Sequence, residues 1–151
     1  LRVMAGFIIG FDGETAGAGD RIVQFAEATA IPTTTFAMLQ ALPHTALWHR
    51  LQKEGRLRDK DGTINQTNLM NFVPSRPLPE IAQEYISAFW HLYDPEVYLD
   101  RVYRCFLKMG PPRCKPAAKP IDWVEVRALL IVCWRQGIKR RTRWKFWFYL
   151  F

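Results

Sequence analysis

Cysteine is scarce in this sequence. The 151 residues contain three, Cys105, Cys114 and Cys133, at wide spacings. An odd number so widely spaced does not suit a disulfide framework, and zinc sites use ligands at shorter spacing. We therefore expect a reducing, cytoplasmic setting and no metal bound by this chain alone.

Long apolar runs are also lacking. A helix that spans a bilayer needs about 18 consecutive apolar residues, and the longest candidate, Ala128 to Trp134, stops at Arg135. The chain does not open on an initiator methionine, and an apolar run begins within three residues of Leu1. We expect the natural polypeptide to start earlier, so that the missing N-terminal part of the same polypeptide is the first partner of this chain.

Acidic residues are nearly absent from the last third. Residues 101–151 contain 13 Lys and Arg against 2 Asp and Glu, whereas residues 1–100 contain 8 against 12. The net charge of +7 therefore comes from the C-terminal third. Such an asymmetry predicts an interaction surface at that end.

The front of the chain has the pattern of a parallel α/β protein. Val3 to Phe11 is an apolar run without alternation, typical of a strand buried on both faces. Thr33 to Leu39 is a second, β-branched and aromatic run. Helices are predicted after each, over 18–28 and 45–54, with Thr45 as the N-cap of the second and Gly55 following its end. This order predicts parallel strands joined by a right-handed crossover.

Beyond residue 55 the strand pattern is lost. Residues 56–79 are predicted to form an irregular connection, and apolar positions at helical spacing follow over 78–93. Residues 110–120 contain four prolines and predict a linker. A last helix is expected to run from about residue 123 to 136, where Gly137 breaks or kinks it.

Two glycines in the first strand allow a ligand or another backbone to approach closely. Ligands of α/β proteins bind beyond the carboxyl ends of parallel strands, where backbone groups are unpaired. The run from Gly6 to Gly10 matches neither the dinucleotide pattern of three spaced glycines nor a phosphate loop with Lys-Ser/Thr. By itself it is equally consistent with a buried strand whose small residues serve packing.

Several segments, taken in order, resemble radical S-adenosylmethionine (SAM) enzymes, most closely the branch with an N-terminal cobalamin-binding domain. Met4 to Thr15 resembles the fifth-strand segment of that family, and Leu39 to Leu51 resembles the end of its sixth strand and the following helix. Asn71 to Pro74 and Tyr98 to Tyr103 resemble parts of its C-terminal helical extension. The resemblance covers nearly the whole chain.

The resemblance implies an α/β fragment, made of the last two strand–helix units of a partial (β/α), TIM-like barrel and an all-α C-terminal extension. Residues 1–57 are expected to end the barrel, 58–77 to connect, and 78–151 to form the extension with a basic aromatic tail. The implied full-length protein is a radical SAM iron–sulfur enzyme of oxidoreductase or methyltransferase type.

The resemblance also implies which residues hold the cofactor. Contacts to the adenosyl part of SAM are expected from Gly6, Ile8, Gly10, Glu14, Leu39, Ala41 and Pro43. The [4Fe–4S] cluster of the family is held by three closely spaced cysteines, which this chain lacks. We therefore expect the cluster and cobalamin to be bound outside this chain, which alone is expected to be inactive and to carry no catalytic residue.

Other candidate sites are few. His44, at the expected barrel mouth, could contact an unknown small-molecule or lipid-like substrate, although a histidine in such a loop often bonds only to nearby backbone. The sequence has no Gly-x-Ser-x-Gly nucleophile motif. No pair of its three histidines has the spacing of metal ligands.

The basic aromatic tail allows three interpretations. Its cations and rings suit the surface of an anionic membrane, nucleic acid, or an amphipathic helix whose rings pack on the enzyme while its charges are solvated. Nucleic acid is the least favoured. The residues concerned are Arg140, Arg141, Arg143, Trp144, Lys145 and Trp147. A small basic helical module that binds a membrane or nucleic acid is thus the alternative to an enzyme fragment, but it would not need two buried parallel strands.

Overall fold

A computed structural model of the chain describes residues 4–58, 70–110 and 122–151. The chain forms two compact units, Leu1–Tyr93 and Asp94–Phe151. The first unit contains strands β1 (Met4–Ile9) and β2 (Thr33–Met38) and helices α1 (Ala18–Thr29), α2 (Ala46–Lys53) and α3 (Leu78–Leu92). The second contains helices α4 (Pro95–Met109), α5 (Trp123–Trp134) and α6 (Arg143–Leu150), with the π-helix η1 (Arg135–Lys139) after α5.

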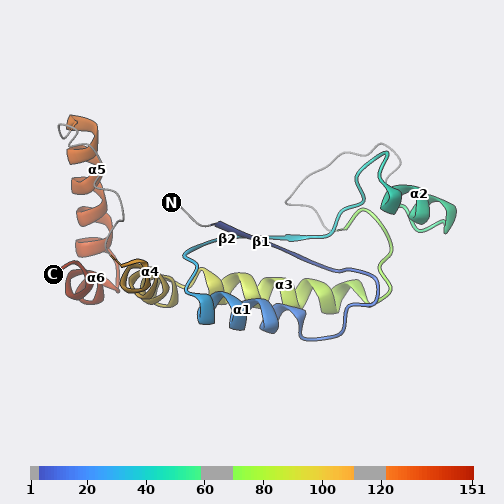
Figure 1. Ribbon diagram of the computed structural model, residues 1–151, viewed down its shortest axis with the longest axis horizontal. Helices are drawn as coiled ribbons and strands as arrows, with labels where there is room; N and C mark the ends of the chain where they lie inside the picture. The colour runs from blue at the N-terminus through green and yellow to red at the C-terminus, as the bar shows by residue number, and fades with distance from the viewer. Residues whose placement is uncertain (1–3, 59–69, 111–121) are drawn as a thin grey trace. The chain divides into compact units, whose positions relative to one another are not determined.

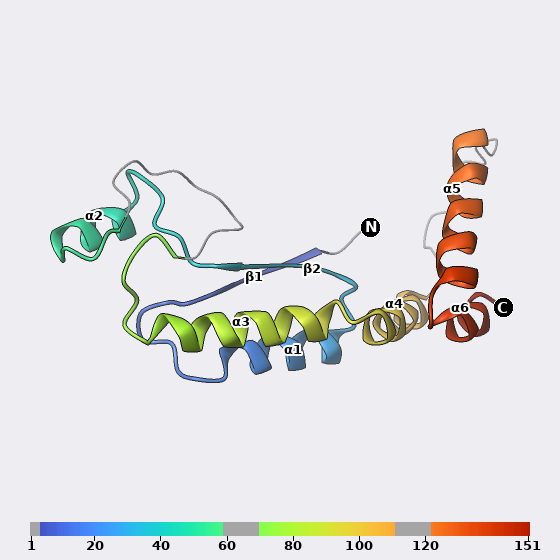
Figure 2. The ribbon, with the colours of Figure 1, turned by 180° about the vertical axis from the view of Figure 1, so that it is seen from behind.

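The two strands of the first unit form a parallel sheet, as the sequence predicts. Met4 lies opposite Thr33, and the register continues to Ile9 opposite Met38. Helix α1 is the crossover, and both views show α1 and α3 side by side on one face of the sheet (Figures 1 and 2). Tyr85 of α3 donates a hydrogen bond to the Phe36 carbonyl of β2 at 3.3 Å, which ties this helix to the sheet.

The opposite face of the sheet differs from the prediction of a strand buried on both sides. Exposed and more buried residues alternate along β1, so that Met4 is 66% and Ile8 49% exposed. Successive side chains of a strand point to opposite faces, and no segment within the described ranges covers this one. The described residues therefore form a two-stranded sheet covered on one face, which is less than the expected partial barrel.

The hydrophobic core of the first unit lies below the carboxyl ends of the strands. It joins the last residue of β1 to helices α1, α2 and α3 and to the segment at 70–72. Its buried members are Ile9, Ala18, Ala41, Trp48, Leu51, Met70, Phe72 and Ile81. Because residues from six segments meet here, including Ala41 in the loop after β2, the positions of the strand ends depend on this core.

Local sequence signals place most helix ends. The Thr45 hydroxyl accepts a hydrogen bond from the Trp48 N–H at 3.2 Å, which confirms the predicted N-cap of α2. Gly55 follows that helix at φ 67°, a left-handed conformation that glycine adopts without strain. Helix α3 begins at Leu78, where the predicted helical extension starts. One boundary differs from the prediction, because α5 passes at Trp134 into a π-helix that contains Gly137. The predicted linker lies mostly outside the described residues.

The second unit has its own internal contacts. Tyr103 of α4 and Tyr149 of α6 stack with ring centroids 4.2 Å apart. Asp100 accepts a hydrogen bond from the Tyr149 hydroxyl and forms an ion pair with Lys145 at 2.8 Å. These contacts join α4 to α6. Helix α5, in contrast, has no buried residue.

Helices α1 and α3 approach each other closely at Gly19. A Cβ atom on this glycine would lie 2.7 Å from the Glu84 carbonyl oxygen, closer than van der Waals contact allows. The helices can therefore pack at this distance only with glycine at position 19.

Gly19→Ala is therefore expected to lower the free energy of unfolding by about 1–3 kcal/mol, the usual cost of overpacking, although alanine normally stabilises a helix relative to glycine. Urea unfolding of the two proteins would measure the difference. Gln24→Ala, at an exposed position of the same helix, is the control and should change stability by less than about 0.5 kcal/mol. A Gly19→Ala protein as stable as the control would contradict the close packing.

Candidate functional site

The candidate site is the edge where both parallel strands end. The Leu39 N–H donates to the Ile9 carbonyl at 2.8 Å, which extends the pairing one residue past β2. The loops that begin at Gly10 and Gln40 therefore start side by side. The sequence reasoning placed its cofactor contacts in these two loops and in β1, and the structure brings the loops together at one edge.

The loop after β1 is a tight turn closed by a side chain. Gly10 has φ 101° and donates its N–H to the Glu14 carboxylate at 2.8 Å. A Cβ at Gly10 would meet the Met70 Cε at 2.8 Å, so the backbone passes directly over the core here. Glu14 therefore fixes the turn, and its carboxylate already has a partner in this structure.

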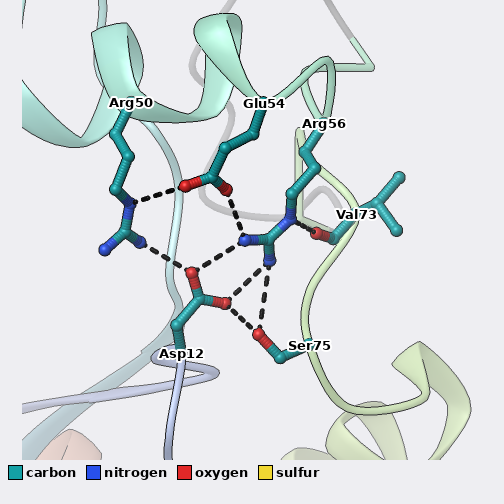
Figure 3. Close-up of polar contacts among 6 residues, drawn as sticks. All are labelled: Asp12, Arg50, Glu54, Arg56, Val73 and Ser75. Atoms are coloured by element: carbon teal, nitrogen blue, oxygen red, sulfur yellow. Dashed lines mark hydrogen bonds and ion pairs between the residues drawn. The ribbon is translucent and has the colours of Figure 1, made fainter.

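Asp12, at the tip of this turn, is the centre of an ion cluster (Figure 3). Its carboxylate accepts hydrogen bonds from Arg50 at 2.6 Å and from both terminal nitrogens of Arg56, at 2.7 and 2.9 Å. The Ser75 hydroxyl donates to the same carboxylate at 2.5 Å, and Glu54 pairs with Arg56 at 2.8 Å. The cluster thus joins the β1 loop, the end of α2 and the segment before α3.

The pKa values in the cluster follow from these contacts. The hydrogen bonds from Arg56 hold the pKa of Asp12 well below its usual range, although partial burial opposes this shift. The same pairing raises the pKa of Arg56. Both groups therefore remain charged at neutral pH, and Asp12 has its acceptor positions filled.

Glu84 of α3 holds the other end of the same loop. Its carboxylate accepts hydrogen bonds from the Gly17 and Ala18 N–H groups at 3.0 and 3.1 Å, at the N-terminus of α1. Arg76 pairs with it at 2.5 Å. Burial is the largest single effect on the pKa of Glu84 and raises it, but Arg76 and the backbone donors outweigh burial and lower it. A side chain therefore satisfies the positive end of this helix.

The second loop is held through a backbone clamp. The Asn71 side chain accepts from the Ala41 N–H at 2.8 Å and donates to the Ala41 carbonyl at 2.9 Å. Ala41 is fully buried beneath this pair. Pro43 is half-buried, while His44 is exposed at φ 64°, a left-handed conformation that is uncommon for histidine. His44 thus stands at the solvent side of the strand ends.

The predicted cofactor residues fall into two groups. Gly6 and Ile8 lie on the open face of β1, where a ligand could reach them. Gly10 and Ala41 are buried and hold the backbone of the two loops, while Leu39 packs against the core. A ligand can therefore reach Gly6 and Ile8, whereas Gly10, Ala41 and Leu39 support the two loops from within.

The residues of the basic aromatic tail are also divided. Lys145 is paired with Asp100, and the Trp147 indole N–H donates to the Gly137 carbonyl at 2.9 Å. Arg140 and Arg141 are exposed, as are Arg143 and Trp144, which form a cation–π contact at 5.7 Å. Lys145 and Trp147 therefore contact other parts of the second unit, whereas the contact of Arg143 and Trp144 is between neighbours in sequence.

Sequence reasoning missed the ion cluster, the Asn71 clamp and Glu84. The contacts of Asp12, Asn71 and Glu84 with the two loops and with α2 join residues 30 to 67 positions apart, and no local pattern links them. One usable signal was the polar segment Asp12-Gly13-Glu14 directly after a buried strand, since charged groups at such a position need partners. Ser75 is one of those partners.

The donor set of the described residues does not suit a metal cluster. No group of three His, Cys, Asp or Glu side chains within the described ranges stands close enough to bind a metal ion. Cys105 and Cys133 are half-buried on α4 and α5, and Cys114 lies outside the described residues. Within the same ranges, no helix is both long and apolar enough to cross a membrane.

A parallel strand pair with a crossover helix places the first unit among α/β proteins, in which ligands commonly bind beyond the carboxyl ends of the strands. Residues 45–151 match the family described as Domain of unknown function (DUF4070), and the chain belongs to this family.

Two curated proteins are similar to the chain. An uncharacterized methyltransferase of Synechocystis sp. is 69% identical over the whole of it, and the Hopanoid C-2 methylase of Rhodopseudomonas palustris is 30% identical over 97% of it. The chain spans only 28% of the length of each relative. No solved structure gives a significant match.

Asp12→Asn is expected to lower the free energy of unfolding by about 1–3 kcal/mol at neutral pH, because the hydrogen bonds of the arginines to a charged acceptor are weakened. The pKa of Asp12 is lowered by folding, so its contribution is fully present above about pH 4 and declines as the pH falls toward the folded-state pKa. The difference in free energy of unfolding between wild type and variant should therefore become smaller below about pH 4. Urea unfolding at a series of pH values would measure it.

Asp20→Asn, at an exposed acid in the first turn of α1, provides the control and should lower the free energy of unfolding by less than about 1 kcal/mol. If the difference in free energy of unfolding between wild type and Asp12→Asn stays constant into the acid range, the Asp12 carboxylate is not coupled to the arginines.

Proposed function

We propose that this chain is the C-terminal part of a radical SAM methylase, in which the strand ends contact the adenosyl part of SAM. The names of both relatives support a methyl-transfer reaction. The resemblance of the segments at 4–15 and 39–51 to radical SAM enzymes supports the cofactor. Because one relative is named for its action on a hopanoid, we also propose a lipid-like methyl acceptor.

The single observation that carries the proposal is the open face of β1 beside a fixed edge. Gly6 presents no side chain on this face, and a Cβ there would meet only the Thr35 hydroxyl, at 3.3 Å. Ile8 on the same face is half exposed. A bare backbone next to an aliphatic side chain suits a flat, partly apolar group such as adenine.

SAM bound at a reduced [4Fe–4S] cluster supplies the radical chemistry of such enzymes. The described residues offer no ligand set for a cluster, and we propose that residues outside this chain bind the cluster and cobalamin. The chain alone is accordingly proposed to be inactive. Its own contribution is to position the cofactor, through Gly6 and Ile8, rather than to transfer protons or electrons.

The two fixed loops have a positioning role in this proposal. Asp12 and Glu84 hold the β1 loop at both ends, and Asn71 holds the second loop at Ala41. A site that must hold SAM and substrate in register benefits from loops that lose little freedom on binding. His44, exposed on the second loop, is the proposed substrate contact, and the helical extension 78–151 is the proposed substrate-side cap.

In the full-length protein, Gly6→Val is expected to weaken SAM binding at least about tenfold, because two methyl groups would occupy the face that adenine approaches. The thermal unfolding temperature should stay within a few degrees of the wild type, since valine favours strands and the position is open. Isothermal titration with SAM measures the first quantity and calorimetry the second.

Thr33→Val is the matched control, because Thr33 lies on the same face at the amino end of β2. It replaces a hydroxyl by a methyl group on the same face, away from the proposed contact, and should bind SAM like the wild type. Unchanged SAM affinity in Gly6→Val would refute the proposed cofactor contact.

A further inference from the structure

Helix α5 carries apolar side chains that no described residue covers. Leu130 is 61% and Trp134 55% exposed, and the neighbouring aliphatic residues of the helix are exposed as well. None of the twelve residues of α5 is buried. A contiguous apolar surface of this kind marks a site that contacts a partner or a membrane.

This surface includes a groove that combines apolar and cationic walls. The groove has a volume of about 620 Å³ and opens to solvent. Its lining residues are Arg127, Leu130, Ile131, Trp134, Arg135 and Lys139. Half of the lining is therefore aliphatic or aromatic, and the other half carries positive charge.

The three cations of the groove have no opposite charge to neutralise them. Residues 126–151 contain seven Lys and Arg and no Asp or Glu. Within the described ranges, none of the three forms an ion pair, whereas Lys145 in the same unit does. An anionic ligand can therefore approach this groove without displacing a carboxylate, and nearby Arg140 and Arg141 add to the positive potential.

An internal contact fixes the shape of the groove. The ring of Trp147 lies against Gly137 in η1, where a Cβ would meet the ring at 2.6 Å, and its indole donates to the Gly137 carbonyl. The π-helix that follows α5 thus has its conformation set by α6. Arg135 and Lys139, at the two ends of η1, are held beside Trp134 in consequence.

We propose that this groove and the exposed side of α5 dock on the surface of an anionic lipid bilayer. Arg127, Arg135 and Lys139 would contact lipid phosphates, while Trp134 and Leu130 enter the boundary between headgroups and acyl chains. A helix of twelve residues is about 18 Å long, too short for a hydrocarbon core of about 30 Å. It therefore lies in the interface, where tryptophan and cations on one helix are favoured.

Charge complementarity favours an acidic bilayer over a protein partner, a second copy of the chain or nucleic acid. A bilayer with acidic lipids offers many phosphates beside an apolar layer, which matches both walls of the groove. A protein partner or a second copy of this chain would have to bring carboxylates to three unpaired cations, and residues 126–151 of a second copy contain none. Nucleic acid would leave the aliphatic wall facing a polar backbone.

The test is flotation of the full-length protein with vesicles of phosphatidylcholine, alone or with added phosphatidylglycerol. We expect flotation only with phosphatidylglycerol, and less of it as salt is raised. Arg127→Gln with Arg135→Gln should weaken partitioning on the order of 30-fold, since each cation near the surface is worth about 1 kcal/mol. Lys53→Gln with Arg58→Gln removes the same charge from exposed positions elsewhere and should have a much smaller effect.

A second pair of variants tests the apolar wall. Leu130→Ser should weaken flotation, whereas Leu107→Ser, at an equally exposed position of α4, should not. Thermal unfolding of each variant verifies that it is folded. The proposal is overturned by absence of flotation, by equal loss in the matched pairs, or by equal binding to both vesicle types.

Two further results would identify a different occupant and would also overturn the proposal. A large fall in the unfolding temperature of Leu130→Ser would show that the rest of the protein covers α5. Loss of concentration-dependent self-association in that variant would show that a second copy does.

Discussion

The position of the loop after β1 depends on one carboxylate, Asp12. It lies just past the end of β1, and it accepts hydrogen bonds from Arg50, Arg56 and Ser75, which come from two later parts of the chain. An exposed ion pair contributes little to stability, but a partly buried carboxylate with four donors is a stronger constraint. Asp12 adds the β1 loop to the end of α2 and the segment before α3, which are already paired with each other because the Val73 N–H donates to the Arg56 carbonyl at 2.8 Å.

A second carboxylate, Glu84, completes the support of the same loop. It occupies the N-terminus of α1, a position where helices commonly bind anions. The chain therefore fills its most obvious anion site with its own side chain and leaves the open face of β1 as the surface available to a ligand. This division explains why Gly10 and Ala41, although expected to touch a cofactor, are buried, whereas Gly6 and Ile8 are accessible.

Features that depend on neighbours in sequence could be predicted from the sequence. The Thr45 cap, Gly55 and the parallel order of the strands rest on local residue types and connection lengths, and the structure confirms them. The Asp12 cluster could not be predicted, because Asp12 and Arg56 are 44 residues apart and many arginines compete as partners. The apolar run at 3–11 suggested two covered faces, since periodicity does not tell whether the covering segments belong to the same chain. The contact of Trp147 with Gly137 could not be predicted either, because glycine has no side chain that would signal it in the sequence.

The central claim is that the edge formed by the ends of β1 and β2 faces SAM. The most direct measurement is hydrogen–deuterium exchange of the full-length protein with and without SAM. The account predicts slower exchange in β1 and the loop after it, at 4–17, and in the segment at 39–44 when SAM is bound. SAM binding that slows exchange elsewhere and leaves both segments unchanged would contradict it.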